Sequence, residues 1–131
     1  MGGIGMAYAL YDKVTAPDRS APDVAVDSYL RALLVERDDV KARLYLCDSP
    51  QVAALEQLRH DLQSREKKYE ATISIHWGAL ETHITDESAV VTTELKLTAL
   101  VGGSAPTEFQ RWSFEARQKN GWRVCSASRV D

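Results

Sequence analysis

The first part of the chain carries its hydrophobic residues at the spacing of an α-helix. Beginning near Ser20, which stands at capping-box distance from Asp23, apolar side chains recur at i, i+3, i+4, i+7 and i+8. The pattern predicts a helix over residues 20–36 with Pro22 in its first turn, a shorter helix over residues 38–47, and a third helix capped by Ser49. The residues that share the apolar face of the first helix are Val26, Tyr29, Leu30, Leu33 and Leu34.

The second part of the chain changes to a period of two, which is the period of a β-strand. Alternating apolar and polar residues predict strands within residues 69–84, 88–101, 107–118 and 119–130. Asn120 and Gly121 predict a two-residue hairpin turn before the last strand. Because helices come first and strands second, we predict an α+β domain in which three N-terminal helices pack on one face of an antiparallel sheet of about four strands.

The composition is that of one ordinary globular domain. The 131 residues are 44% hydrophobic and 27% charged, and the formal net charge is -3. A nucleic-acid-binding protein usually shows a basic excess or a basic stripe, and this sequence has neither. The histidines at positions 60, 76 and 83 lack the spacing of a metal site, and residues 101–106 lack the lysine of a phosphate-binding loop. We therefore predict no metal, no cofactor and no nucleic-acid partner.

The opening residues differ from the rest of the chain. Residues 1–11 are uncharged and rich in glycine and apolar side chains, and residues 12–19 are mostly polar and contain Pro17. The uncharged run is shorter than the roughly 20 residues that cross a bilayer. We interpret residues 1–19 as the end of a truncated single-pass membrane anchor with a linker, and residues 20–131 as the folded domain. The alternative is a disordered or docked terminal segment. The anchor interpretation predicts an extracytoplasmic domain that meets the cell membrane only through this anchor.

Three N-terminal helices followed by long, meandering strands resemble the nuclear transport factor 2-like fold, also called cystatin-like. The closing segment N-G-W-R-V-C-S-A-S-R-V looks like the last hairpin and strand of that family, and the resemblance covers about residues 20–131. The apolar start, the A-P-D-R-S-A-P linker and the Y-L-R-A helix look like bacterial membrane-anchored proteins that carry such a domain outside the membrane. The resemblance implies a strongly curved sheet that the helices close into a cone, often around a pocket. Because this fold hosts isomerases, cyclases, dehydratases and non-catalytic domains, it leaves the function open.

The candidates for a pocket or a partner surface are aromatic or titratable residues. Alternation places His76 on the strand face opposite Trp77, and Glu94 on the face that carries Lys96, so His76 and Glu94 are expected to point away from the core. Since no base can be paired with a hydrogen-bond donor from the sequence, we name no catalytic residue and favour a protein that is not an enzyme. The candidates are Tyr45, for which helix packing is the alternative, His76, Trp77, Glu94 and Trp122.

The two cysteines, Cys47 and Cys125, are expected to form a disulfide. In the resembled architecture the last strand, which carries Cys125, lies under the helices, so a bond to Cys47 in the second helix would join the helical layer to the sheet. Strict alternation places Cys125 on the same strand face as Arg123 and Arg129, opposite the face of Trp122 and Val124. The bond therefore requires either a bulge near Cys125 or a position of these arginines at the margin of the sheet, where they reach water. A disulfide needs an oxidising compartment, in agreement with the anchor interpretation. The alternative is two buried free thiols.

Three functions are compatible with these features, and the first is favoured. It is a non-catalytic extracytoplasmic domain that binds an unidentified protein or a small apolar ligand. The second is a small pocket enzyme of the isomerase, cyclase or dehydratase kind, which a polar dyad deep in a closed pocket would favour. The third is a cytoplasmic scaffold that dimerises through the open sheet face. We also expect a homodimer formed through a polar strip of the sheet made of Thr92, Glu94, Lys96 and Thr98.

Overall fold

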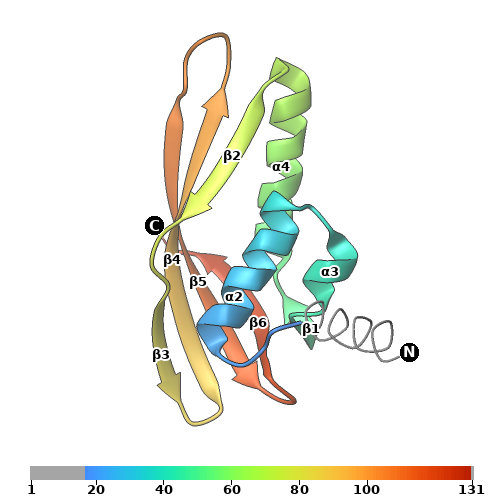
Figure 1. The fold of residues 1–131 in the computed structure, drawn as a ribbon, viewed down its shortest axis with the longest axis vertical. Coiled ribbons are helices and arrows are strands. Elements are labelled where there is room, and N and C mark those ends of the chain that lie inside the picture. Colours follow the sequence, from blue (N-terminus) through green and yellow to red (C-terminus); the bar gives the residue numbers. More distant parts are fainter. Residues whose placement is uncertain (1–16, 131) are drawn as a thin grey trace, which may run out of the picture.

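The structure is a computed structural model that describes residues 17–130 (Figure 1). The predicted membrane anchor lies outside the described residues. Within residues 17–130, no helix combines the length and the hydropathy that crossing a bilayer requires. The described residues form helices followed mainly by strands, which confirms the predicted α+β class.

The helical part contains α2 (Pro22–Leu30), the π-helix η1 (Arg31–Val35), α3 (Asp39–Arg43) and α4 (Ala53–Tyr69). The helix predicted over residues 20–36 is present as α2 continued by η1. The predicted capping box does not form, because Ser20 Oγ instead donates to the Asp18 carboxylate at 2.7 Å and α2 has no side-chain cap. Hydrogen bonds from the Ser20 side chain and main chain lower the pKa of Asp18. The chain is therefore turned into α2 by a local Asp–Ser turn.

The described residues contain six strands, which are β1 (Leu46–Gln51), β2 (Thr72–Trp77), β3 (Glu81–Thr85), β4 (Ser88–Leu100), β5 (Thr107–Gln118) and β6 (Trp122–Arg129). They form one sheet in the order β1-β6-β5-β4-β2, and β3 pairs with β4 on the same edge as β2. The β4–β5 and β5–β6 pairs are antiparallel, whereas β1 runs parallel to β6, so the sheet is mixed.

The prediction of about four antiparallel strands was wrong in two places. The segment predicted as one strand over residues 69–84 is divided into β2 and β3, because the chain leaves the β4 ladder between them. Thr93 Oγ1 donates to the Ala79 main-chain oxygen at 3.1 Å and holds this crossing against β4. The hairpin before β6 is present, but it has three connecting residues, with Asn120 and Gly121 at φ 55° and 95°.

The second error is β1, which occupies the end of the predicted second helix and the start of the third. Leu46 is buried beside β6, where it is in register with Val124. Ser49 therefore lies in a strand and caps no helix, and the residue at the N-cap of α4 is Val52. Pro50 is tolerated because β1 lies at the edge of the sheet, where one side of the strand needs no ladder hydrogen bond. Pairing with a distant strand thus overrides the local helix signal.

The helices pack on one face of the sheet, with α2 and α4 nearest to the strands in Figure 1. The core lies between these layers, and its largest fully buried side chains come from α2, η1, α4 and the inner faces of β4, β5 and β6. They include Tyr29, Leu30, Leu33, Leu55, Leu62, Val91, Leu95, Phe114 and Val124. Alternate residues of β4 face this core, as the period of two predicts.

The end of α4 is fastened to the rest of the core by Glu66. Its carboxylate accepts a hydrogen bond from Arg37 Nη1 and another, at 2.9 Å, from the Ile73 main-chain N–H at the start of β2. Burial raises the pKa of Glu66, but the hydrogen bonds from Arg37 and Ile73 outweigh burial and leave the pKa below its usual range. One side chain therefore connects the loop after η1, helix α4 and the first residues of β2.

Candidate functional site

The predicted disulfide is present and joins Cys47 of β1 to Cys125 of β6, with their Cα atoms 4.9 Å apart. Cys125 is the extra residue of a β-bulge, because Glu115 is in register with Ser126 and Ala116 with Val124. The bulge interpretation of the broken alternation is therefore confirmed. The bond does not join the helical layer to the sheet as expected, since Cys47 lies in an edge strand and not in a helix.

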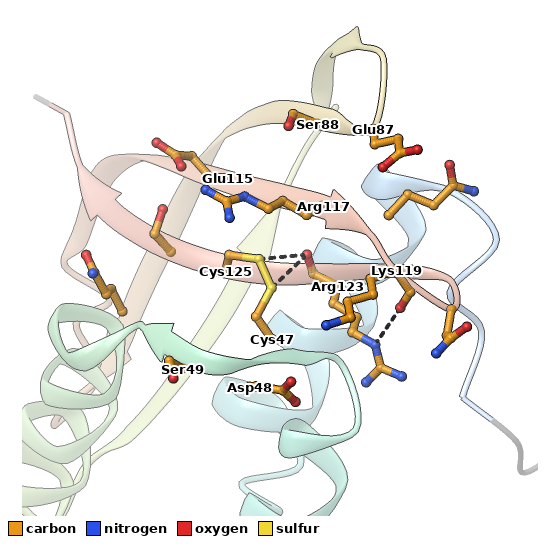
Figure 2. A pocket seen from close by; sticks show the side chains of 14 residues that line it. Cys47, Asp48, Ser49, Glu87, Ser88, Glu115, Arg117, Lys119, Arg123 and Cys125 are labelled. Atoms are coloured by element: carbon orange, nitrogen blue, oxygen red, sulfur yellow. Dashed lines mark hydrogen bonds between the residues drawn. A yellow bond between two sulfur atoms is a disulfide. The ribbon is translucent and has the colours of Figure 1, made fainter.

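The disulfide lies in the floor of an open hollow of about 880 Å³ (Figure 2). The Cys47 and Cys125 sulfurs are 3.9 and 3.8 Å from the Arg123 main-chain oxygen. The lining is polar and contains as many acidic as basic side chains among the described residues, so it does not select for one sign of charge. The charged side chains that line it are Asp48, Glu87, Glu115, Arg117, Lys119 and Arg123.

A second pocket, of about 350 Å³, lies between the C-terminal half of α4 and the adjoining ends of β2, β4 and β5. Its size is within the range of small-molecule sites. The polar side chains among its lining residues include Arg65 of α4 and Glu108 of β5. The rest of the lining is mainly apolar and includes Leu62, Tyr69, Ala71, Ile73, Leu97, Ala99, Val101 and Pro106. We call this the apolar pocket.

A chain of hydrogen bonds runs from the apolar pocket into the core along the inner face of β5. Gln110, which is 5% exposed, donates from Nε2 to Glu108 Oε2 at 2.6 Å. Its Oε1 accepts from Trp112 Nε1 at 3.1 Å. The sequence pattern did not identify the apolar pocket. The available signal was Gln110 itself, a polar residue on the strand face that also carries Trp112, Phe114 and Ala116.

Three of the predicted site residues come together at the end of β2. His76, Trp77 and Glu94 line a shallow hollow of about 410 Å³, together with Lys96 and Phe109. His76 and Glu94 are exposed, as alternation predicted. This hollow contains a histidine, a carboxylate and an ammonium group on an open surface, with no enclosed space around them.

Trp77 is held at the edge of that hollow by contacts with α2. Its Nε1 donates to Asp27 Oδ1 at 2.8 Å, and the Arg31 guanidinium lies 5.5 Å from the centre of its ring. Asp27 also forms an ion pair with Arg31 at 3.5 Å. The polar edge of the indole is therefore satisfied within the protein, which favours a structural contribution from Trp77.

The other two predicted site residues lie in the core. Tyr45 is 7% exposed and Trp122 is 5% exposed. Tyr45 lies just before β1, and Trp122 packs with Ala25, Ala89 and Ala116 in a small separate cluster. The structure therefore does not bring them together with His76, Trp77 and Glu94. Among the described residues, no three His, Cys, Asp or Glu side chains gather in a way that could hold a metal ion.

No protein-family model matches the sequence, and no curated protein matches it either. Similar structures are nevertheless found. An NTF2-like protein with a cystatin-like fold from Novosphingobium aromaticivorans has a TM-score of 0.62 and 13% identity, over 96% of this chain and 85% of that one. A ketosteroid isomerase-like protein from Erwinia carotovora atroseptica has a TM-score of 0.58 and 14% identity, over 84% and 94% of the two chains.

A third similar structure is an NTF2-like protein of unknown function in nutrient uptake from Rhodospirillum rubrum. Its TM-score is 0.54 and its identity is 18%, over 80% of this chain and 95% of that one. At such identities the likeness concerns the fold and not the activity. The described part of the chain therefore has a nuclear transport factor 2-like fold, as the order of its elements had predicted.

Proposed function

We propose that this domain is a non-catalytic, extracytoplasmic binding domain that holds a small apolar ligand in the apolar pocket. The observation that carries the proposal is the pocket itself, about 350 Å³ in volume and lined mainly by aliphatic side chains. Arg65 and Glu108 provide polar contacts, so the pocket suits a ligand that is largely apolar and has a polar end. An apolar body would supply most of the binding free energy, and the polar end would fix its orientation.

A non-catalytic role is supported by the kinds of residue that surround the apolar pocket. The described residues that line it include one carboxylate, Glu108, and no histidine. Glu108 already accepts a hydrogen bond from Gln110. General acid–base catalysis needs a titratable group within reach of the substrate and usually a second group that stabilises the developing charge. Glu108 is better suited to anchoring the polar end of a ligand.

The extracytoplasmic location is supported by the disulfide between Cys47 and Cys125, since disulfides persist mainly in oxidising compartments. The uncharged run of residues 1–11 agrees with an anchor that precedes the domain. The test takes protein from its native cells, unfolds it without reductant in an excess of an alkylating reagent, and counts the thiols that react from the gain in mass per chain. We expect no reactive thiol, and two thiols per chain would contradict the extracytoplasmic location.

Ligand binding is tested by filling the apolar pocket. Anilinonaphthalene sulfonate is a suitable probe, because it has an apolar ring system and an anionic end that can meet Arg65. Ala99→Phe places a ring in the pocket and should weaken binding of the probe at least about tenfold. Ala54→Phe is the matched control, since Ala54 is exposed on α4 outside the pocket. Equal affinities in the two variants, with both folded by circular dichroism, would contradict the assignment of the pocket.

A further inference from the structure

A small cavity of about 130 Å³ lies among the three α-helices, away from the apolar pocket. Its lining includes Tyr29 of α2, Asp39 and Arg43 of α3, and Glu56 and Arg59 of α4. Cavities of about 150 Å³ hold a molecule the size of benzene. This cavity can therefore hold a molecule of a few non-hydrogen atoms.

Two buried polar atoms of residues that line this cavity have no hydrogen-bond partner among the described residues. They are the hydroxyl oxygen of Tyr29, whose residue is fully buried, and Nε of Arg59. Buried polar groups in folded proteins are almost always paired. A guanidinium Nε can only donate, and a tyrosine hydroxyl donates readily, so the two groups call for an oxygen acceptor.

The cavity lining contains two acidic side chains, Asp39 and Glu56, and two basic ones, Arg43 and Arg59, so the unpaired donors and not the net charge decide which acceptor fits. Asp39 and Glu56 are exposed, whereas Arg59 is only partly exposed. Arg59 Nη1 binds the Asp39 carboxylate, which leaves Nε as the edge of the guanidinium that is available inside the protein. Burial raises the pKa of the Tyr29 hydroxyl, and the negative charge of Glu56 raises it further. The hydroxyl therefore keeps its proton at neutral pH and can donate a hydrogen bond.

We propose that this cavity binds the carboxylate of a small organic acid, with the Tyr29 hydroxyl and Arg59 Nε as its two hydrogen-bond donors. Hydrogen bonds to a carboxylate are stronger than those to a neutral oxygen, and the guanidinium edge is suited to carboxylate geometry. Leu33 and Leu46 also line the cavity and would contact a short alkyl group. The site is separate from the apolar pocket, and its occupancy does not depend on the function proposed for that pocket.

The experiment uses acetate and propionate as probes, added to the folded domain and followed by the amide chemical shifts of α2, α3 and α4. Sodium chloride at the same ionic strength is the salt control, and acetamide is the uncharged analogue of acetate. We expect the wild-type domain to respond saturably to both carboxylates. Its affinity for acetamide should be at least about tenfold weaker than for acetate, and the affinity of the variant Tyr29→Phe for acetate should fall by at least the same factor. Tyr45→Phe is the matched control, because it makes the same change at a core tyrosine that does not line the cavity.

The outcomes distinguish a carboxylate site from bound water and from a general effect of salt. A saturable response that Tyr29→Phe weakens at least about tenfold and Tyr45→Phe preserves supports the site. No saturable response in the wild-type domain, or an equal response to acetate and chloride, overturns it, and ordered water then satisfies the two donors. A response that Tyr29→Phe leaves unchanged overturns the assignment of donors. Circular dichroism and urea unfolding of each variant establish that it is folded, and removal of an unpaired hydroxyl should leave the domain folded.

Discussion

The disulfide between Cys47 and Cys125 should provide a large part of the stability of this domain. It closes a segment with a sequence separation of 78 residues. In the chain-entropy model, closing a loop of that length destabilises the unfolded chain by about 4.5 kcal/mol at most, and strain or residual structure reduces the gain. Domains of ordinary size have a free energy of unfolding of about 5–15 kcal/mol. Loss of the bond should therefore remove a substantial share of the stability, about 2–4 kcal/mol of that total.

The native contacts of β1 suggest that little compensates for loss of the bond. The β1–β6 ladder has an irregularity between its two register pairs, Leu46 with Val124 and Gln51 with Ser126. The disulfide fastens this edge strand near its start, at its second residue. We therefore expect β1 to exchange its amide hydrogens much faster once the bond is broken, whereas the central strands β4 and β5 should stay protected.

The measurement is urea unfolding of the oxidised domain, the reduced domain and the double variant Cys47→Ala/Cys125→Ala. We expect the reduced domain and the double variant to lose about 2–4 kcal/mol, with a larger dependence of the free energy on urea, because the unfolded chain is no longer held in a loop. Reductant should leave the double variant unchanged. A loss below about 1 kcal/mol together with an unchanged urea dependence would refute the idea that the bond acts by restricting the unfolded chain.

Two further changes test local features of the fold. Glu66→Gln should destabilise the domain by about 2 kcal/mol at neutral pH, because two partly buried hydrogen bonds lose their charged acceptor. Since the pKa of Glu66 is lowered by folding, its contribution is complete above its usual pKa and disappears as the pH falls through the folded value. The difference from wild type should therefore shrink in acid, and a difference that stays constant as the pH falls would contradict a contribution from the charged form of Glu66. Gly121→Ala should cost about 1–3 kcal/mol in thermal unfolding, since Gly121 has φ 95° and an added Cβ would lie 2.8 Å from Arg19 Cβ. Gly78→Ala, where an added Cβ meets no atom within 4 Å, should cost much less, and similar losses in the two variants would contradict a steric and backbone origin of the loss at Gly121.

The prediction of the candidate site from the sequence was less complete than that of the fold. Alternation placed His76 and Glu94 on exposed strand faces, and the structure brings them together with Trp77. The sequence did not distinguish these residues from Tyr45 and Trp122, which are buried, because an aromatic residue on an apolar face suits a pocket and a core equally well. The apolar pocket and the cavity beside Tyr29 depend on how separate elements meet, which no local pattern records.

The sequence by itself determined the α+β class, the first helix, the long strands β4, β5 and β6 and the pairing of Cys47 with Cys125, since these depend on local periodicity and on the presence of only two cysteines. The tertiary structure decided that residues 46–51 form a strand, because their hydrogen bonds and apolar contacts are made with β6, more than 70 residues away in the chain. It also decided that β2 and β3 are separate strands on one edge of β4. Burial and pairing between distant segments outweigh local propensities of a few tenths of a kcal/mol per residue, which is why these features appear only in the folded protein.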